Sequence, residues 1–201
     1  MRKQLFLLLT VLIVGSCALA APKKTPAKKP LPVWQPAPAL LKQLAPQSEL
    51  PFGTIRLPRG YELFDFPYPF EAGTNLNWSK KTASGEVHDI FLMMQIPAEE
   101  LGWQNLSLDM VFSEFMNGFR RRFDNARQTP AKQGLVKGRR TLRTDWNGTY
   151  RSTRVKLNGT IFMTRDATDV YVIQTGHRVN SAAGQRLTEA AALTFKVQSQ
   201  N

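Results

Sequence analysis

The chain has 201 residues and a formal net charge of +12, with one cysteine and two histidines. A single cysteine excludes an internal disulfide framework, and so few cysteines and histidines argue against a metal centre built from them. The charge is uneven: residues 120–156 carry twelve basic and two acidic side chains, a net +10, whereas residues 51–119 carry four basic and nine acidic ones, a net −5. This separation predicts an anionic partner, because it shapes the surface potential rather than the fold.

Residues 1–20 are predicted to be a signal peptide. Two basic residues precede an apolar run over residues 5–14, which is too short for a membrane-spanning helix of about 20 residues. Two cleavage sites compete: an A-x-A site at residues 18–20, and a "VGSC" stretch that resembles a bacterial lipobox and ends in Cys17. With the second site, Cys17 would become a lipidated N-terminus. Either site predicts an exported protein that is periplasmic, secreted or held at the cell envelope.

Residues 21–50 are predicted to be a linker rich in proline and lysine, which cannot build a core of its own. Its lysines either keep the spacer in solution or attract it to an anionic membrane, at about 1 kcal/mol per lysine. One helical turn is expected at residues 40–44. The remaining residues, 51–201, are long enough for a single globular domain.

The first half of this domain is predicted to form β-strands. Their expected ranges are residues 53–57, 61–64, 76–81 and 88–96. In the last of these strands, Leu92 and Met94 point to one face while Phe91 and Met93 point to the other. Apolar residues on both faces are typical of a central strand that is covered on both sides.

After this strand, the spacing of the apolar residues changes to that of a helix. Ser107 is a good N-cap, and apolar residues follow at helical spacing from Leu108 to Phe123. Three arginines stand near the end of the segment, where positive charges interact favourably with the negative end of the helix dipole. Phe115 stands at the centre of the apolar stripe and is predicted to be buried against the sheet.

A long antiparallel meander is predicted next. Strands at 136–144 and 149–157 flank Asn147-Gly148, a sequence typical of a two-residue type I′ hairpin turn. A second Asn-Gly pair precedes two further strands and a C-terminal helix over residues 182–192, which is expected to bury Leu187 and Leu193.

The first Asn-Gly turn would fix the register of its hairpin, with paired residue numbers summing to 295. Four cations would then share one face of the ribbon: Arg139, Arg143, Arg154 and Lys156. They form the predicted binding surface for a lipid headgroup, a cell-wall polymer or an acidic protein, and the alternative is an ordinary solvated sheet face. Nucleic acid is disfavoured because the chain is exported and has no nucleic-acid-binding motif.

Residues that could carry chemistry are sparse. His88 and Asp89 are adjacent on a strand, so they are expected on opposite faces and not as a pair. His177 stands at a strand end, and no spacing typical of metal ligands is present. The aromatic stretch from Tyr61 to Phe70 favours packing over a partner-binding patch. No catalytic residue, metal or cofactor is predicted.

The order of these elements, with the phrases "IRLPRGYELF", "VYVIQTG" and "AALTFKV", resembles the PsbP-like α/β/α sandwich family. That family includes photosystem extrinsic subunits and bacterial lipoprotein relatives. The resemblance implies an α+β fold, in which an antiparallel sheet with a long meander is packed by one amphipathic helix and a C-terminal helix. It also implies a non-catalytic binding or assembly role, here at the cell envelope. The alternative is an envelope hydrolase with an unrecognised site.

Overall fold

The computed structural model describes residues 29–64, 73–83, 85, 87–178 and 181–198. The unit Leu31–Asn201 contains all the helices and strands described below. The predicted signal peptide, Cys17 and most of the aromatic stretch lie outside the described residues. Within the described part of the chain, no helix has both the length and the apolar character needed to cross a membrane.

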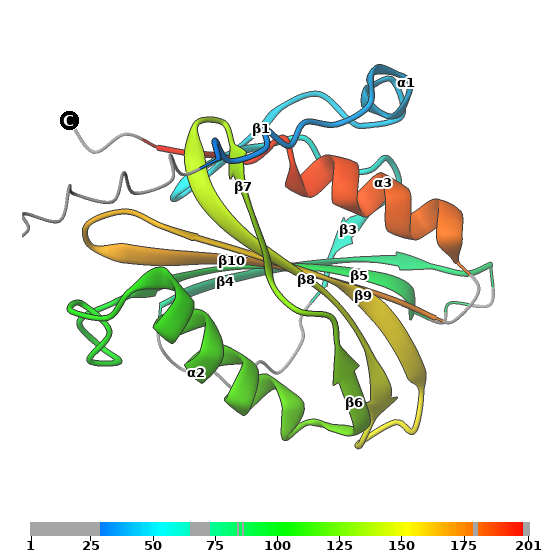
Figure 1. Ribbon diagram of the computed structural model, residues 1–201. Helices are drawn as coiled ribbons and strands as arrows, with labels where there is room; N and C mark the ends of the chain where they lie inside the picture. Colours follow the sequence, from blue (N-terminus) through cyan, green and yellow to red (C-terminus); the bar gives the residue numbers. More distant parts are fainter. Residues whose placement is uncertain (1–28, 65–72, 84, 86, 179–180, 199–201) are drawn as a thin grey trace, which may run out of the picture. The chain divides into compact units, whose positions relative to one another are not determined.

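The core of this unit is an eight-stranded antiparallel sheet (Figure 1). Its strands lie in the order β3-β4-β5-β10-β9-β8-β6, and β7 pairs with the remaining part of β8. Their bounds are β3 Glu62–Leu63, β4 Thr74–Lys81, β5 Val87–Pro97, β6 Phe123–Gln128, β7 Lys132–Val136, β8 Arg139–Tyr150, β9 Lys156–Arg165 and β10 Asp169–Arg178. A smaller sheet joins β1 Ser48–Leu50, β2 Gly53–Ile55 and β11 Lys196–Val197.

Helices cover both faces of the large sheet, which gives the α+β sandwich predicted from the sequence. In Figure 1, α2 (Leu108–Arg120) lies on one face and α3 (Ala182–Ala192) on the other. The α2-side core contains Met94 and Ile96 of β5, whereas the α3-side core contains Phe91 and Met93 of the same strand. The prediction that β5 is a central strand buried on both faces is therefore confirmed.

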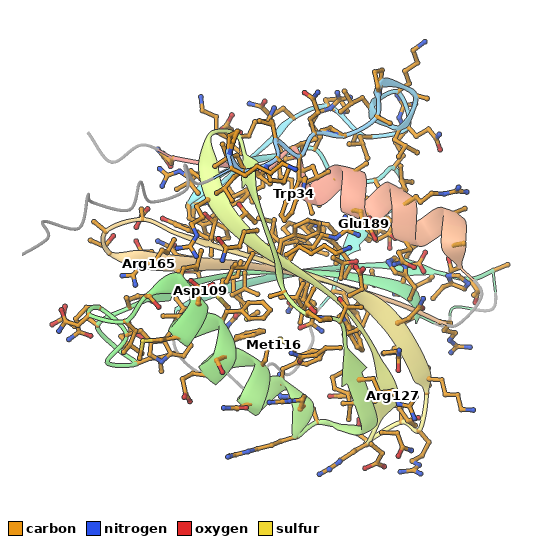
Figure 2. All side chains as sticks on the ribbon, viewed as in Figure 1. Trp34, Asp109, Met116, Arg127, Arg165 and Glu189 are labelled. Atoms are coloured by element: carbon orange, nitrogen blue, oxygen red, sulfur yellow. The ribbon has the colours of Figure 1, made fainter. Side chains whose placement is uncertain are left out.

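Helix α2 forms as its sequence pattern predicted. The Ser107 hydroxyl accepts a hydrogen bond from the Met110 backbone N–H at 3.3 Å and caps the first turn. The apolar stripe faces the sheet, with Phe115 only 1% exposed, and Figure 2 shows Met116 pointing the same way. The helix ends at Arg120, and Phe123 starts β6 while still packing on Phe119 at 4.8 Å between ring centroids.

Helix α3 also has its predicted bounds, but its contact with the sheet is made mainly by small residues. Ala190, Ala191 and Ala192 are buried, whereas Leu187 and Leu193 pack against the α3-side core while partly exposed. Small side chains let the helix backbone approach the sheet closely, so the polar side chains between them can reach across to the strands.

The prediction that the two Asn-Gly pairs form hairpin turns is wrong. Asn147-Gly148 lies inside β8, and Thr141 pairs with Thr164, so that paired numbers sum to 305 rather than 295. Gly148 and Gly159 permit close packing instead: a Cβ on Gly159 would lie 1.9 Å from the Thr175 carbonyl oxygen. The β7–β8 turn is at Lys137-Gly138, whose φ values of 49° and 80° fit a type I′ turn.

The predicted linker is too long. Residues from Leu31 onward belong to the folded unit, and they include helix α1 (Pro38–Leu41) and strand β1. The Trp34 ring lies over Gly134, where an added Cβ would be 2.4 Å from the indole, and Leu44 is completely buried. Large apolar side chains thus anchor the second half of a segment whose proline content suggested a spacer.

Candidate functional site

Arg143, one of the four cations predicted to bind a partner, instead connects α3 to the sheet. Its guanidinium lies 2.9 Å from the Glu189 carboxylate and 3.2 Å from that of Asp145, and it stacks over the Phe162 ring at 5.5 Å. Figure 2 shows Glu189 on α3. The Thr160 hydroxyl is 3.0 Å from both carboxylates, which closes a polar network beneath the helix.

Of the other predicted cations, the strand register places Arg139 and Lys156 on the same side of the sheet as Arg143, whereas Arg154 leaves the strand. Arg154 lies in the turn at residues 151–155 with a φ of 59°, and it forms an ion pair with Asp124 of β6. Lys156 is exposed at the start of β9. The predicted face of four cations is therefore reduced to three positions, because Arg154 lies in the turn between β8 and β9, which comes several residues later than the Asn-Gly pair indicated.

Two further arginines of residues 120–156, and Arg165 beyond them, also make structural contacts. Arg140 pairs with Asp109 of α2, and Arg151 lies 2.9 Å from the Asp124 carboxylate. Arg165 donates to the carbonyl oxygens of Trp103 and Leu106 in the loop that precedes α2. Part of the high local charge of the sequence therefore connects strands, loops and helices to one another.

Arg139 has a different setting, because it lines a hollow on the α3 side of the sheet. Two further cations line this hollow: Lys137 from the β7–β8 turn and Lys196 from β11. We call this site the basic pocket. Its volume is about 230 Å³, and its other lining residues are the hydroxyl-bearing Thr141, Thr164 and Tyr171 and the apolar Val136, Phe162, Ile173, Ala192, Phe195 and Val197. The β7–β8 turn with the start of β8, and the distant strand β11, thus bring three cationic residues to one hollow.

The charges of the basic pocket are only partly countered. Burial alone would raise the pKa of Asp166, but hydrogen bonds from backbone N–H groups and from the Tyr171 hydroxyl outweigh it, and the charge of Arg139 lowers the pKa further. Asp166 is therefore an ionised neighbour. Within the described residues, Lys137, Arg139 and Lys196 form no ion pair.

A histidine–aspartate cluster lies elsewhere, and the prediction that His88 and Asp89 do not pair is wrong. Nδ1 of His88 is 2.9 Å from Oδ1 of Asp89, and Nδ1 of His177 is 2.8 Å from the same oxygen. In β4, Lys80 pairs with Asp89 and Lys81 with Val87, so His88 is the extra residue of a β-bulge. A bulge breaks strand alternation and changes the direction of a side chain, which lets His88 reach its neighbour.

The buried part of this cluster is structural. His177 and Thr188 are both fully buried, and Nε2 of His177 lies 2.8 Å from the Thr188 hydroxyl of α3. Burial alone would raise the pKa of Asp89, but the hydrogen bond and charge of His177, with those of His88, outweigh it and lower that pKa. Burial and the Asp89 carboxylate together raise the pKa of Tyr61. Among the described residues, no group of three or more histidine, cysteine and acidic side chains could hold a metal ion.

Sequence reasoning found Arg139 but missed Lys137 and Lys196. The Lys137-Gly138 pair between two alternating segments is itself a turn signal, and reading it would have placed Lys137 beside Arg139. No local pattern places Lys196 there, because it reaches the site only through the pairing of β11 with β2.

Comparisons with known proteins support the fold. No family model matches the chain, and no curated protein matches it. The solution structure of the cyanobacterial PsbP (CyanoP) from Synechocystis sp. PCC 6803 superposes with a TM-score of 0.56 at 12% identity, covering 78% of this chain and 93% of that one. A protein of unknown function from Pseudomonas aeruginosa, PA94, gives 0.52 at 6% identity, covering 79% and 99%. The fold is therefore PsbP-like, as the resemblance in sequence suggested.

Proposed function

We propose that the protein is a non-catalytic, exported binding or assembly protein of the cell envelope, and that its basic pocket holds an anionic group of its partner. The observation that carries this proposal is the convergence of Lys137, Arg139 and Lys196 on one hollow without ion pairs among the described residues. A hollow lined by both cations and apolar side chains suits a partner that presents an acidic group beside apolar surface, because both parts of such a partner gain contacts.

The alternative of an envelope hydrolase has less support. A hydrolytic site needs a base or nucleophile that the substrate can reach. The basic pocket is lined by the hydroxyl groups of Thr141, Thr164 and Tyr171, but none of its lining residues is a histidine, cysteine, aspartate or glutamate that could act as their base. The Thr188–His177–Asp89 arrangement has the hydrogen bonds of a catalytic group, but its histidine and threonine are completely buried.

Export is supported by the sequence of residues 1–20, and mass spectrometry of the mature protein tests it. We propose that Cys17 becomes a lipidated N-terminus. A diacylated chain starting at Cys17 would support this, whereas an unmodified chain starting at Ala21 would support an ordinary signal peptide. A mature chain that retains Met1 and the whole apolar run would contradict export.

Capture of partners from the envelope fraction of the source cells tests the binding role. The wild-type chain should retain a partner that the double variant Lys137→Glu/Arg139→Glu loses. The matched control is Arg127→Glu/Lys132→Glu, which reverses two exposed cations outside the basic pocket; Figure 2 shows Arg127 on β6. Equal capture by both double variants would contradict a role for the basic pocket.

A further inference from the structure

The lining of the basic pocket defines more closely the anionic group that fits it. Lys137 and Lys196 are exposed and Arg139 is half-buried, whereas the apolar lining is buried, with Ile173 4% and Ala192 2% exposed. In Figure 1 the β7–β8 turn lies close to β11, and both border the hollow. The three cations therefore stand at the mouth of the basic pocket, and its apolar part lies further in.

The hydroxyl groups of the lining already donate their hydrogens to the protein. Each donates to a protein oxygen: Thr141 to the Arg139 carbonyl at 3.1 Å, Thr164 to the Arg140 carbonyl at 2.8 Å and Tyr171 to the Asp166 carboxylate at 2.8 Å. A hydroxyl has one hydrogen to donate, so these groups offer a ligand only acceptor lone pairs. Among the lining side chains, the donors left for an anion are therefore those of the two lysines and the arginine.

Two carboxylates lie near the basic pocket, but neither is among its lining residues. Burial raises the pKa of the Tyr171 hydroxyl, and so do the hydrogen bond to Asp166 and the charges of Asp166 and Asp169. The Tyr171 hydroxyl is therefore neutral, and the three cations at the mouth outnumber the two neighbouring acids. The mouth of the pocket keeps an excess of positive charge.

We propose that the anionic group held by the basic pocket is a phosphate monoester that carries a short apolar chain, an inference that rests on the proposed function. A phosphate monoester has three free oxygens and a charge of about −1.5 to −2 at pH 7, so it can contact all three cations at once. A carboxylate has only two oxygens and a single charge. Both guanidinium and ammonium groups bind phosphate in proteins.

The volume of the hollow limits the apolar chain. Its volume of about 230 Å³ equals that of roughly seven or eight water molecules in the liquid, at about 30 Å³ each. With the phosphate among the cations at the mouth, the hollow accommodates a chain of about six carbons, if one methylene group takes the space of about one water. Buried apolar side chains then contact the chain on its sides, as they would contact one another in a core.

Calorimetric titration of the chain of residues 1–201 with soluble alkyl phosphates tests this inference. Hexyl phosphate should bind with one site per chain, about tenfold more tightly than heptanoate, which has an equally long chain but one oxygen fewer. From methyl to hexyl phosphate, affinity should rise about fourfold with each buried methylene and then stop rising once the hollow is full. Inorganic phosphate, which lacks the chain, should bind much more weakly than hexyl phosphate.

The charge of the phosphate gives an independent test. A phosphate monoester loses its second proton at a pKa of about 6, so hexyl phosphate should bind several-fold more tightly at about pH 7.5 than at about pH 5. Hexyl sulfate has the same chain and three oxygens but stays singly charged over this range. Its affinity should not change with pH, and it controls for titration of the protein's own groups.

The contribution of the third cation is tested by a matched pair of variants. Lys196→Met should weaken hexyl phosphate binding about tenfold and heptanoate binding less, because the carboxylate has no third oxygen for this lysine. Lys132→Met removes an exposed cation outside the pocket lining and should change neither affinity. Thermal unfolding of both variants shows that the fold is retained.

The outcomes separate this inference from the proposed function. Equal affinity for heptanoate and hexyl phosphate, affinity independent of chain length, or unchanged binding by Lys196→Met would each overturn the assignment of a phosphate with an apolar chain. Binding of polyglutamate that salt weakens would then leave the proposed function standing. Failure of the folded chain to bind any of these anions would overturn both.

Discussion

Replacing Arg143 by methionine tests whether this residue holds α3 on the sheet, as the structure shows, or forms a free binding face. The side chain is 27% exposed and that of Glu189 is 18% exposed, so their ion pair is shielded from water more than a surface pair is. Exposed pairs contribute about 0–1 kcal/mol, and hydrogen bonds to charged groups about 1.5–3 kcal/mol. For this half-buried pair we expect a value between these ranges.

Removing the Arg143 guanidinium also leaves the carboxylates of Glu189 and Asp145 close together without a cation. Glu189 and Asp145 both lie 3.0 Å from the Thr160 hydroxyl, and without the guanidinium their like charges repel. Adding this repulsion, Arg143→Met should lower the free energy of unfolding by about 2 kcal/mol. Lys156→Met, which removes an exposed cation on the neighbouring strand, should change it by no more than about 0.5 kcal/mol.

Urea unfolding followed by circular dichroism measures both changes. A double-mutant cycle with Glu189→Gln should give a coupling energy of about 1 kcal/mol, because the two residues contact each other directly. If Arg143→Met costs less than about 0.5 kcal/mol and shows no coupling, then Arg143 is not a structural connection and the original binding-face prediction regains support.

Three further predictions concern the core. Phe115→Ala should cost about 3–5 kcal/mol in urea unfolding, against a small effect for the exposed Met110→Ala, and a small cost at Phe115 would show that the stripe of α2 does not face the sheet. Gly159→Ala should destabilise the fold by more than about 1 kcal/mol, because its Cβ would clash with the Thr175 carbonyl, and a neutral effect would contradict the close strand packing. The pKa of Asp89 is lower in the folded state than in the unfolded state. The ionised Asp89 therefore stabilises the fold above its unfolded-state pKa of about 3.9, and this stabilisation is lost as the pH falls through its folded-state pKa. Asp89→Asn should therefore flatten the acid end of the stability–pH curve, and an unchanged curve would contradict the assigned role of the buried cluster.

The parts of the fold that sequence reasoning found are those with a strong local period. Strand β5 and helix α2 each bury a continuous set of apolar residues, so alternation and helical spacing located them and their buried faces. The prediction of the hairpin register failed because an Asn-Gly pair indicates only that a turn is allowed at that position. At Gly148 and Gly159 the missing side chain is needed for close approach to Phe123 and to the Thr175 carbonyl, which no local pattern shows.

The candidate site was harder to predict because it depends on long-range pairing. Arg139 was selected for its charge, but the cations beside it in the basic pocket come from the β7–β8 turn and from β11. Arg143 does not join them, because it forms ion pairs with Glu189 of α3 and Asp145 of β8. The His88–Asp89 pair was missed for a similar reason, since a bulge arises from the register between β4 and β5 and cannot be seen in β5 alone.

Binding to a defined anionic surface at two salt concentrations is the most direct test of the central claim, that the basic pocket holds an anionic group. Vesicles of anionic phospholipid and soluble polyglutamate serve as probes, with neutral vesicles as the reference. The wild-type chain should bind at least one anionic probe at 0.1 M salt, where charges act over about 10 Å, and release it at 1 M, where they act over about 3 Å. Lys137→Glu/Arg139→Glu should abolish this binding and Arg127→Glu/Lys132→Glu should retain most of it. Binding that is indifferent to salt, or that both double variants lose equally, would contradict the claim.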